Sequence, residues 1–183
     1  LLTGNWTQAD GRRAAAALHR AWRPFRVARI HRESTSIVSF HLEAADGAGL
    51  PPNQTGQHLP IRLRLAAKEP AVIRTYTLSA APSDADFRIS VKRDGAASIY
   101  LHDHLSVGDL LEARAPEGGF IVDAAERRPL VLISAGVGIT PMLAMLRHVV
   151  YEGLRTRRMR QTWFLHSART AAERPFDTEL AAL

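Results

Sequence analysis

The hydrophobic pattern of this chain changes near residue 126, from short alternating segments to a continuous apolar run. Before that point, segments that alternate apolar and polar residues are separated by turns rich in Gly and Pro. Such alternation is typical of antiparallel strands with one buried face. The apolar run at residues 129–133 is instead typical of a parallel strand covered on both faces. The pattern therefore predicts two parts with different architectures.

Six alternating segments predict the strands of the first part. Given by their letters and first residues, they are FRVARIH from Phe25, SIVSFHL from Ser36, HLPIRLRL from His58, VIRTYTLS from Val72, FRISVKR from Phe87 and LLEARAP from Leu110. In the third segment, apolar residues at every second position should share one buried face. These are Leu59, Ile61, Leu63 and Leu65. Six strands at this spacing predict an antiparallel barrel or sandwich, with a short helix over residues 98–105 before the last strand.

The order of patterns after residue 126 predicts a β–α–β unit. The apolar strand is followed by a Gly-rich turn, a helical pattern over residues 141–153 and a second strand over residues 161–167. This order is typical of the opening of a doubly wound parallel sheet. Residues 176–183 have the pattern of a helix that has only begun.

We therefore expect three regions along the chain. Residues 1–23 should form an alanine-rich leading helix or a linker from a preceding region. Residues 24–126 should form the antiparallel domain, and residues 127–183 an incomplete doubly wound domain. The first residue is Leu1 rather than Met, and we expect both ends to be cuts from a longer chain.

Composition and charge exclude several classes of site. The chain has no cysteine, which excludes disulfides, thiolate zinc sites and iron–sulfur ligation within it and is compatible with our expectation of a cytoplasmic protein. The sequence contains no apolar run of about 18 residues, so no membrane span is predicted. The net charge of +6 suits anionic ligands or an acidic partner. Binding of nucleic acid is not expected, because the basic run at residues 155–160 lacks interleaved aromatic residues. No metal site is expected either, since His102 and His104 would point to different faces of a helix.

Two turns with small residues are candidates for binding an anion. One leads into the short helix, with Ser98 as its expected N-cap. The other follows the apolar strand, with Thr140 as N-cap and Pro141 at the first helical position. Small residues let the backbone approach a diphosphate, and a helix N-terminus offers free N–H groups, although each turn has a purely structural alternative. The residues of the two turns are Gly95, Ala96, Ala97, Ser98, Gly136, Val137, Gly138, Ile139, Thr140 and Pro141.

The fourth strand carries a third candidate, the succession Arg74, Thr75, Tyr76 and Thr77. Alternation places Arg74 and Tyr76 on one face and Thr77 on the other, unless the chain bends there. An arginine makes forked hydrogen bonds to phosphate, and a tyrosine ring can lie against an aromatic ligand. Taken alone, these residues are also ordinary on the surface of a barrel.

Together these elements resemble the ferredoxin–NADP reductase superfamily, especially the reductase portion of flavohaemoglobins and of oxygenase reductases. The resemblance covers about residues 25–183, and its motifs stand in the family's order: GQHLPIRL, RTYTLS, VKRDGAAS, LHDHLSVGD, APEGGF and SAGVGITPM. It implies a six-stranded antiparallel Greek-key barrel that binds flavin over residues 24–126. The first part of a doubly wound, NAD(P)-binding domain would follow over residues 127–183.

The resemblance also implies roles for individual residues. In this family the arginine of the strand motif holds the flavin phosphates, the tyrosine packs against the flavin ring, and the next hydroxyl residue lies near the hydride-accepting N5 atom. Here these residues are Arg74, Tyr76 and Thr77, and Thr77 is the catalytic candidate. The turn at residues 95–98 would cradle the pyrophosphate. The turn at residues 136–141 would hold the nicotinamide dinucleotide with its C4 atom over the flavin.

The implied activity is hydride transfer from NADH or NADPH to FAD, followed by electron transfer to a haem, iron–sulfur or other acceptor outside this segment. The alternative is a flavin-binding electron-transfer or regulatory module without its own nicotinamide reaction. FAD is favoured over FMN. Ser167 and Arg169 are candidates to contact the 2′-phosphate of NADPH. Arg169 is alternatively a solvated charge, so the choice between NADH and NADPH is left open. His58 stands where relatives often have a tyrosine, and it either stacks on the flavin or is an ordinary strand residue.

Overall fold

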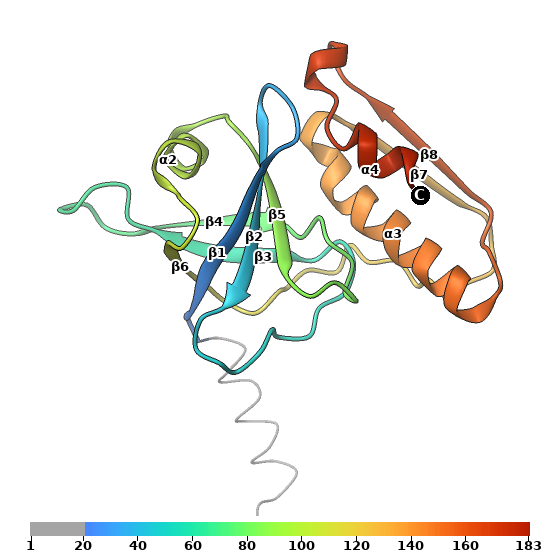
Figure 1. Ribbon diagram of the computed structural model, residues 1–183, viewed down its shortest axis with the longest axis horizontal. Coiled ribbons are helices and arrows are strands. Elements are labelled where there is room, and N and C mark those ends of the chain that lie inside the picture. The colour runs from blue at the N-terminus through green and yellow to red at the C-terminus, as the bar shows by residue number, and fades with distance from the viewer. Residues whose placement is uncertain (1–20) are drawn as a thin grey trace, which may run out of the picture.

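The computed structural model describes residues 21–183, which form two parts lying side by side (Figure 1). The leading helix or linker expected over residues 1–23 falls mostly on residues 1–20 and so lies outside the described residues. No helix within residues 21–183 is long and apolar enough to cross a membrane.

The first part is one six-stranded antiparallel sheet in the order β4-β3-β6-β1-β2-β5, as the alternating segments predict. A bridge between Leu78 and Ile89 joins the two outer strands, so the sheet closes into a barrel. A helix, α2 (Ala96–His104), connects the last two strands. The strands are β1 (Arg23–Arg32), β2 (Ile37–Ala44), β3 (His58–Leu63), β4 (Val72–Thr77), β5 (Phe87–Lys92) and β6 (Leu110–Ala113).

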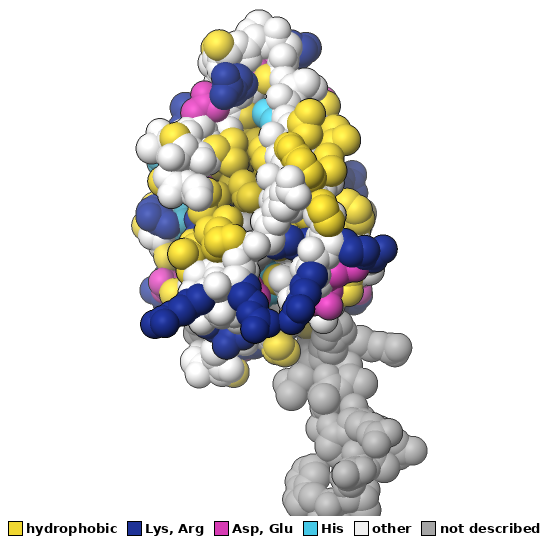
Figure 2. All heavy atoms as spheres, turned by 90° about the vertical axis from the view of Figure 1, so that its right-hand side faces the viewer, with side chains coloured by type: hydrophobic (Ala, Val, Ile, Leu, Met, Phe, Trp, Pro, Cys, Tyr) yellow, Lys and Arg dark blue, Asp and Glu magenta, His cyan; other side chains and the backbone are white. Residues whose placement is uncertain are grey.

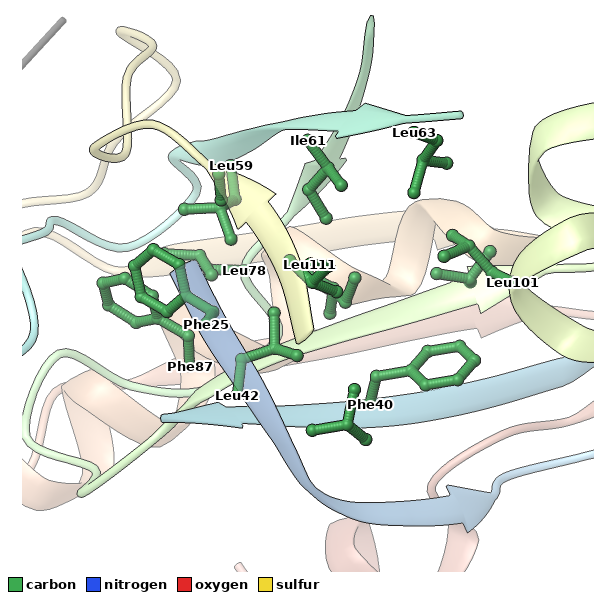
Figure 3. Close-up of a cluster of buried hydrophobic side chains, with 14 of the residues drawn as sticks. Phe25, Phe40, Leu42, Leu59, Ile61, Leu63, Leu78, Phe87, Leu101 and Leu111 are labelled. Atoms are coloured by element: carbon green, nitrogen blue, oxygen red, sulfur yellow. The ribbon is translucent and has the colours of Figure 1, made fainter. Parts of the chain in front are cut away.

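Apolar side chains from each strand fill the interior of the barrel (Figure 3). The rings of Phe25 and Phe87 stack with their centroids 5.9 Å apart. The buried face predicted for the third strand is confirmed: three of its side chains are buried, and the fourth packs against the same cluster while partly exposed. These are Leu59, Ile61, Leu63 and Leu65. Burial of this apolar surface is the main force that holds the barrel together.

The second part is the predicted β–α–β unit, and its two strands pair in parallel. Its elements are β7 (Leu130–Ala135), a 3₁₀ turn (Gly136–Gly138), α3 (Ile139–Thr156), β8 (Thr162–Ser167), a second 3₁₀ turn (Ala171–Glu173) and α4 (Asp177–Ala181). The side chains of Ile139, Leu143 and Phe176 form a small buried cluster between the two helices and the sheet.

One face of the β7–β8 pair is open in the described residues, whereas the sequence predicts a strand covered on both faces. Helices α3 and α4 lie on the other face (Figure 1). Figure 2 looks onto the open face, where apolar side chains gather. Four of them are between 46% and 68% exposed: Val131, Ile133, Trp163 and Leu165. The continuous apolar run thus places alternate residues on the buried and the open face.

Replacement of Leu59 by Ala should lower the free energy of unfolding by about 2–5 kcal/mol, because it removes buried methyl groups and leaves a cavity. Leu110 on β6 is 60% exposed, so Leu110→Ala serves as the matched control, with an expected change within about 0.5 kcal/mol. Urea denaturation followed by circular dichroism measures both. Equal losses for the two variants would contradict the placement of the core.

Candidate functional site

A groove of about 530 Å³ opens where the barrel meets the start of α3. Its walls come from three places far apart in the sequence: the end of β4, the turn into α2, and the turn into α3. The predicted residues that line it are Arg74, Thr75, Tyr76, Thr77, Gly95, Ala96, Ala97, Ser98, Val137, Gly138, Thr140 and Pro141. A hollow of about 650 Å³ at the other end of α3 contains none of them. The fold therefore brings the three candidate motifs to one place.

Strand β4 supplies one wall of the groove. It is an outer strand paired only with β3 in the sheet order, so the backbone groups along its other edge have no partner strand in the described sheet. All four residues from Arg74 to Thr77 line the groove. Alternation predicts that Thr77 faces away from Arg74 and Tyr76. Thr77 nevertheless lines the groove, because β4 ends at that residue.

The side chains on β4 are available to a ligand. The guanidinium of Arg74 is exposed and donates one hydrogen bond, to the carbonyl of its neighbour Ile73 at 2.8 Å. Within residues 21–183 it forms no ion pair. Tyr76 is half-buried, and this burial raises the pKa of its phenol, against a smaller lowering by the charge of Arg74. At neutral pH, Tyr76 is therefore a neutral ring beside a cation.

The turn into α2 forms the second wall, and its cap differs from the prediction. Gly95 is the N-cap, with φ 92° and ψ 163°, a conformation that is essentially restricted to glycine. The prediction of Ser98 as N-cap is wrong. Its hydroxyl instead donates to the carbonyl of Gly95 at 2.9 Å and accepts a bond from the amide of Asp94 at 2.8 Å. The N-cap makes no side-chain cap bond and the first turn holds no acidic residue, so its amides remain free for an anion.

The turn into α3 forms the third wall, and again the helix starts earlier than predicted. Gly138 is the N-cap, so Thr140 and Pro141 are the second and third helical residues rather than N-cap and first residue. The reason is that Gly136 to Gly138 form a 3₁₀ turn that leads directly into the helix. The Thr140 hydroxyl donates back to the carbonyl of Val137 at 3.1 Å. This helix also begins without a side-chain cap or an acidic first turn.

Four of the predicted residues do not line the groove. Ile139 is fully buried in the core of the second part, and Gly136 lies just outside the lining with φ 52°. His58 pairs with Thr77 across the β3–β4 ladder, but its ring lies beside Glu117, with 3.6 Å between Nε2 and Oε1. Arg169, the candidate for a 2′-phosphate, is paired with Glu173 at 2.9 Å.

Three residues that line the groove were missed: Ser90, Lys92 and Asp94. The signal for two of them is present in the sequence, because Ser90 and Lys92 are two apart on β5 and therefore share a face. Lys92 adds a second positive charge beside that of Arg74, and Asp94 adds a negative one. Together with the free amides at the start of α2 and the positive end of the α3 dipole, the charges of the groove favour an anionic ligand.

Comparison with known families agrees with this geometry. Residues 25–121 match the family described as oxidoreductase FAD-binding domain, and residues 132–183 match the oxidoreductase NAD-binding domain.

Individual relatives point the same way. A flavohemoprotein of Bacillus subtilis is 45% identical over 82% of this chain and 37% of its own length. The flavohem-like FAD/NAD-binding domain of nitric oxide dioxygenase from Vibrio cholerae superposes with a TM-score of 0.81, at 36% identity, over 89% of this chain and 69% of that chain. Phthalate dioxygenase reductase, described as transferring electrons from pyridine nucleotides to [2Fe-2S], gives 0.75 at 29% identity, over 88% of this chain and 48% of that one. The chain spans about two fifths of the length of the flavohemoproteins it matches.

Replacement of Gly95 by Ala should cost about 1–3 kcal/mol of stability, because no L residue adopts its backbone conformation without strain. Gly138→Ala is the matched control, since Gly138 has φ −61° and an added methyl group would meet only open space there. That change should be neutral or slightly stabilising. Thermal unfolding of both variants tests this difference. A Gly95→Ala protein as stable as Gly138→Ala would contradict the turn geometry.

Proposed function

This chain belongs to the family of ferredoxin–NADP reductase-like oxidoreductases that join an FAD-binding barrel to an NAD-binding domain, and we propose that it transfers hydride from NADH or NADPH to bound FAD. The electrons would then pass to a haem or iron–sulfur acceptor outside residues 1–183. One observation carries the proposal: a single groove brings together Arg74 to Thr77 and the uncapped starts of α2 and α3.

The residues of the groove fit the diphosphate of FAD. Arg74 has an unpaired guanidinium within the described residues, and the first turn of α2 presents amides with no competing carboxylate in that turn. An arginine and a row of backbone N–H groups are the donors that phosphate oxygens accept best. The small side chains of Ala96 and Ala97 leave the backbone accessible. We assign the diphosphate to Arg74 and residues 95–98.

The ring of the flavin would lie toward Tyr76 and Thr77, on the same wall of the groove. The half-buried Tyr76 offers an aromatic face, and the hydroxyl of Thr77 can donate a hydrogen bond at the edge of the ring. When bound, FAD supplies the atom that accepts hydride, and NAD(P)H is oxidised by two electrons. A donor beside that atom stabilises the charge that develops there.

The turn of residues 136–141 is proposed to hold the nicotinamide dinucleotide against that wall. Val137, Gly138, Thr140 and Pro141 line the groove, and the positive end of the α3 dipole lies at this turn, without a side-chain cap or an acidic residue in the first turn. No general base is required for hydride transfer between two rings, whose rate depends on proximity and orientation. The protein therefore acts by positioning both cofactors.

The acceptor is proposed to be a haem, because the Bacillus subtilis relative at 45% identity is a flavohemoprotein; an iron–sulfur centre, as in phthalate dioxygenase reductase, is the second choice. The chain itself has no cysteine, so an iron–sulfur centre with thiolate ligands would lie elsewhere. We place the protein in the cytoplasm, whose reducing conditions suit a cysteine-free flavin reductase.

Replacement of Arg74 by Gln should weaken FAD binding roughly 10- to 150-fold, because a charge-assisted hydrogen bond contributes about 1.5–3 kcal/mol. Arg26 is an exposed arginine on β1 that does not line the groove, and Arg26→Gln should leave the affinity unchanged. Quenching of flavin fluorescence during titration of the flavin-free protein measures both constants. Equal affinities for the wild type and Arg74→Gln would contradict the assignment of the diphosphate.

Replacement of Thr77 by Val should slow flavin reduction by on the order of 100-fold, because the donor at the ring edge is lost while the shape is kept. Thr77→Ser retains the hydroxyl and should stay within a few-fold of the wild type. Anaerobic stopped-flow absorbance near 450 nm follows the reaction in the full-length protein. If neither NADH nor NADPH bleaches the wild type, the protein is a flavin-binding module without its own nicotinamide reaction.

A further inference from the structure

A buried arginine lies between the barrel and the second part of the molecule. Arg88 on β5 is only 6% exposed. On the outer face of the barrel it donates to the hydroxyl of Ser79 at 3.0 Å and to the carbonyl of Ser79 at 2.6 Å. Across the boundary its guanidinium donates to both carboxylate oxygens of Glu179 on α4, at 2.7 and 3.2 Å. One side chain thus joins the two parts.

A second arginine, which belongs to the second part, reaches back to the barrel. Arg147 on α3 donates to both carboxylate oxygens of Asp84, in the turn before β5, at 2.9 and 3.0 Å. It also donates to Glu179. Burial raises the pKa of Glu179, but its bonds to Arg88 and Arg147 outweigh that effect, and the net pKa lies below its ordinary value. Glu179 is therefore a carboxylate shared by two arginines.

This network reaches the groove through buried hydroxyl groups. The hydroxyl of Ser79, which accepts from Arg88, lies 2.7 Å from the hydroxyl of Ser90. Ser90 is 4% exposed and lines the groove. The wall of the groove and the helices of the second part are thus connected by continuous hydrogen bonds.

Phe176 ties the network to the start of α3. Its ring lies 5.1 Å from the guanidinium carbon of Arg88 and packs with Ile139 and Leu143. Phe176 has φ 65°, an unfavourable conformation for a bulky residue, which persists only where the surroundings hold it. Ile139 directly follows Gly138, a residue of the groove. The buried ring thus links Arg88 to the first helical residue of the proposed dinucleotide turn.

We propose that Arg88, Glu179 and Arg147 are positioning residues that fix the dinucleotide turn of residues 136–141 opposite Arg74 to Thr77. The inference rests on the proposed function. A largely buried ion network is often no more stabilising than apolar packing of the same volume, because its charges lose hydration. Its directional bonds do, however, define one orientation of the two parts. Hydride transfer needs such an orientation, since a misplacement of about 1 Å can cost roughly 100-fold in rate.

The test compares Glu179→Gln with the wild type in the full-length, flavin-loaded protein. The variant keeps the shape of residue 179 and removes the charge shared by the two arginines. Anaerobic stopped-flow measurements give the limiting rate of flavin reduction and the dissociation constant of the nucleotide that reduces the wild type. We expect the limiting rate to fall about 10- to 100-fold, with the dissociation constants of FAD and nucleotide within about threefold of the wild type. Glu152→Gln, which breaks the exposed pair with Arg155 on α3, is the matched control and should change neither.

A second measurement does not depend on turnover. Amide hydrogen exchange of the flavin-loaded protein without nucleotide should be faster at residues 136–141 and 171–183 in Glu179→Gln than in the wild type or the control. If Glu179→Gln does not fold, Arg147→Lys takes its place. It keeps the charge but has one ammonium nitrogen, whereas Arg147 donates to Glu179 through Nη1 and to Asp84 through Nη2. That variant should lower the limiting rate several-fold.

The outcomes separate the two proposals. If the flavin of the wild type is reduced, and the flavin of a folded variant is reduced at the same limiting rate, the positioning role is overturned and the proposed function is not. A lower rate that follows entirely from loss of bound FAD also overturns the positioning role, because a purely structural role would have the same effect. A wild-type flavin that neither nucleotide reduces contradicts the proposed function, and the positioning role with it.

Discussion

The N-terminal ends of α2 and α3, which lie at one groove beside Arg74, are the constraint on which the rest of the structure depends. Both helices begin at a glycine without a side-chain cap, and neither has an acidic residue in its first turn. The groove is therefore rich in hydrogen-bond donors and partial positive charge, with Asp94 as its carboxylate. Donors of this kind are best satisfied by an anionic ligand, and a dinucleotide brings two phosphates.

The two parts of the fold place these donors for different reasons. The closed barrel holds the end of β4 and the turn into α2 together through its packed interior, so that wall is rigid. The start of α3 belongs to the other part, and its position depends on contacts across the boundary. These contacts are mainly polar and directional at Arg88, Arg147 and Glu179. The rigid walls on the barrel suit a tightly bound flavin, and the turn into α3 suits a nucleotide that must arrive and leave.

Much of the fold and part of the site followed from the sequence, because periodicity and glycine turns are local signals. The six strands and the parallel pair were predicted from these signals, whereas the convergence of the three motifs was implied by the family resemblance. The starts of α2 and α3 were not, since Ser98 and Thr140 are good N-caps by type but bond back to Gly95 and Val137 instead. The network at Glu179 was also missed. Its partner Arg88 lies 91 residues away, and no local pattern joins them.

The most direct test of this account is the position of the flavin in a crystal structure of the full-length protein purified with FAD. The account predicts electron density for the diphosphate between Arg74 and the amides of residues 95–98. The ring should lie against Tyr76 and Thr77, open toward Gly138. A flavin bound anywhere else, or density for FAD that leaves Arg74 and Gly95 without contact, would contradict it.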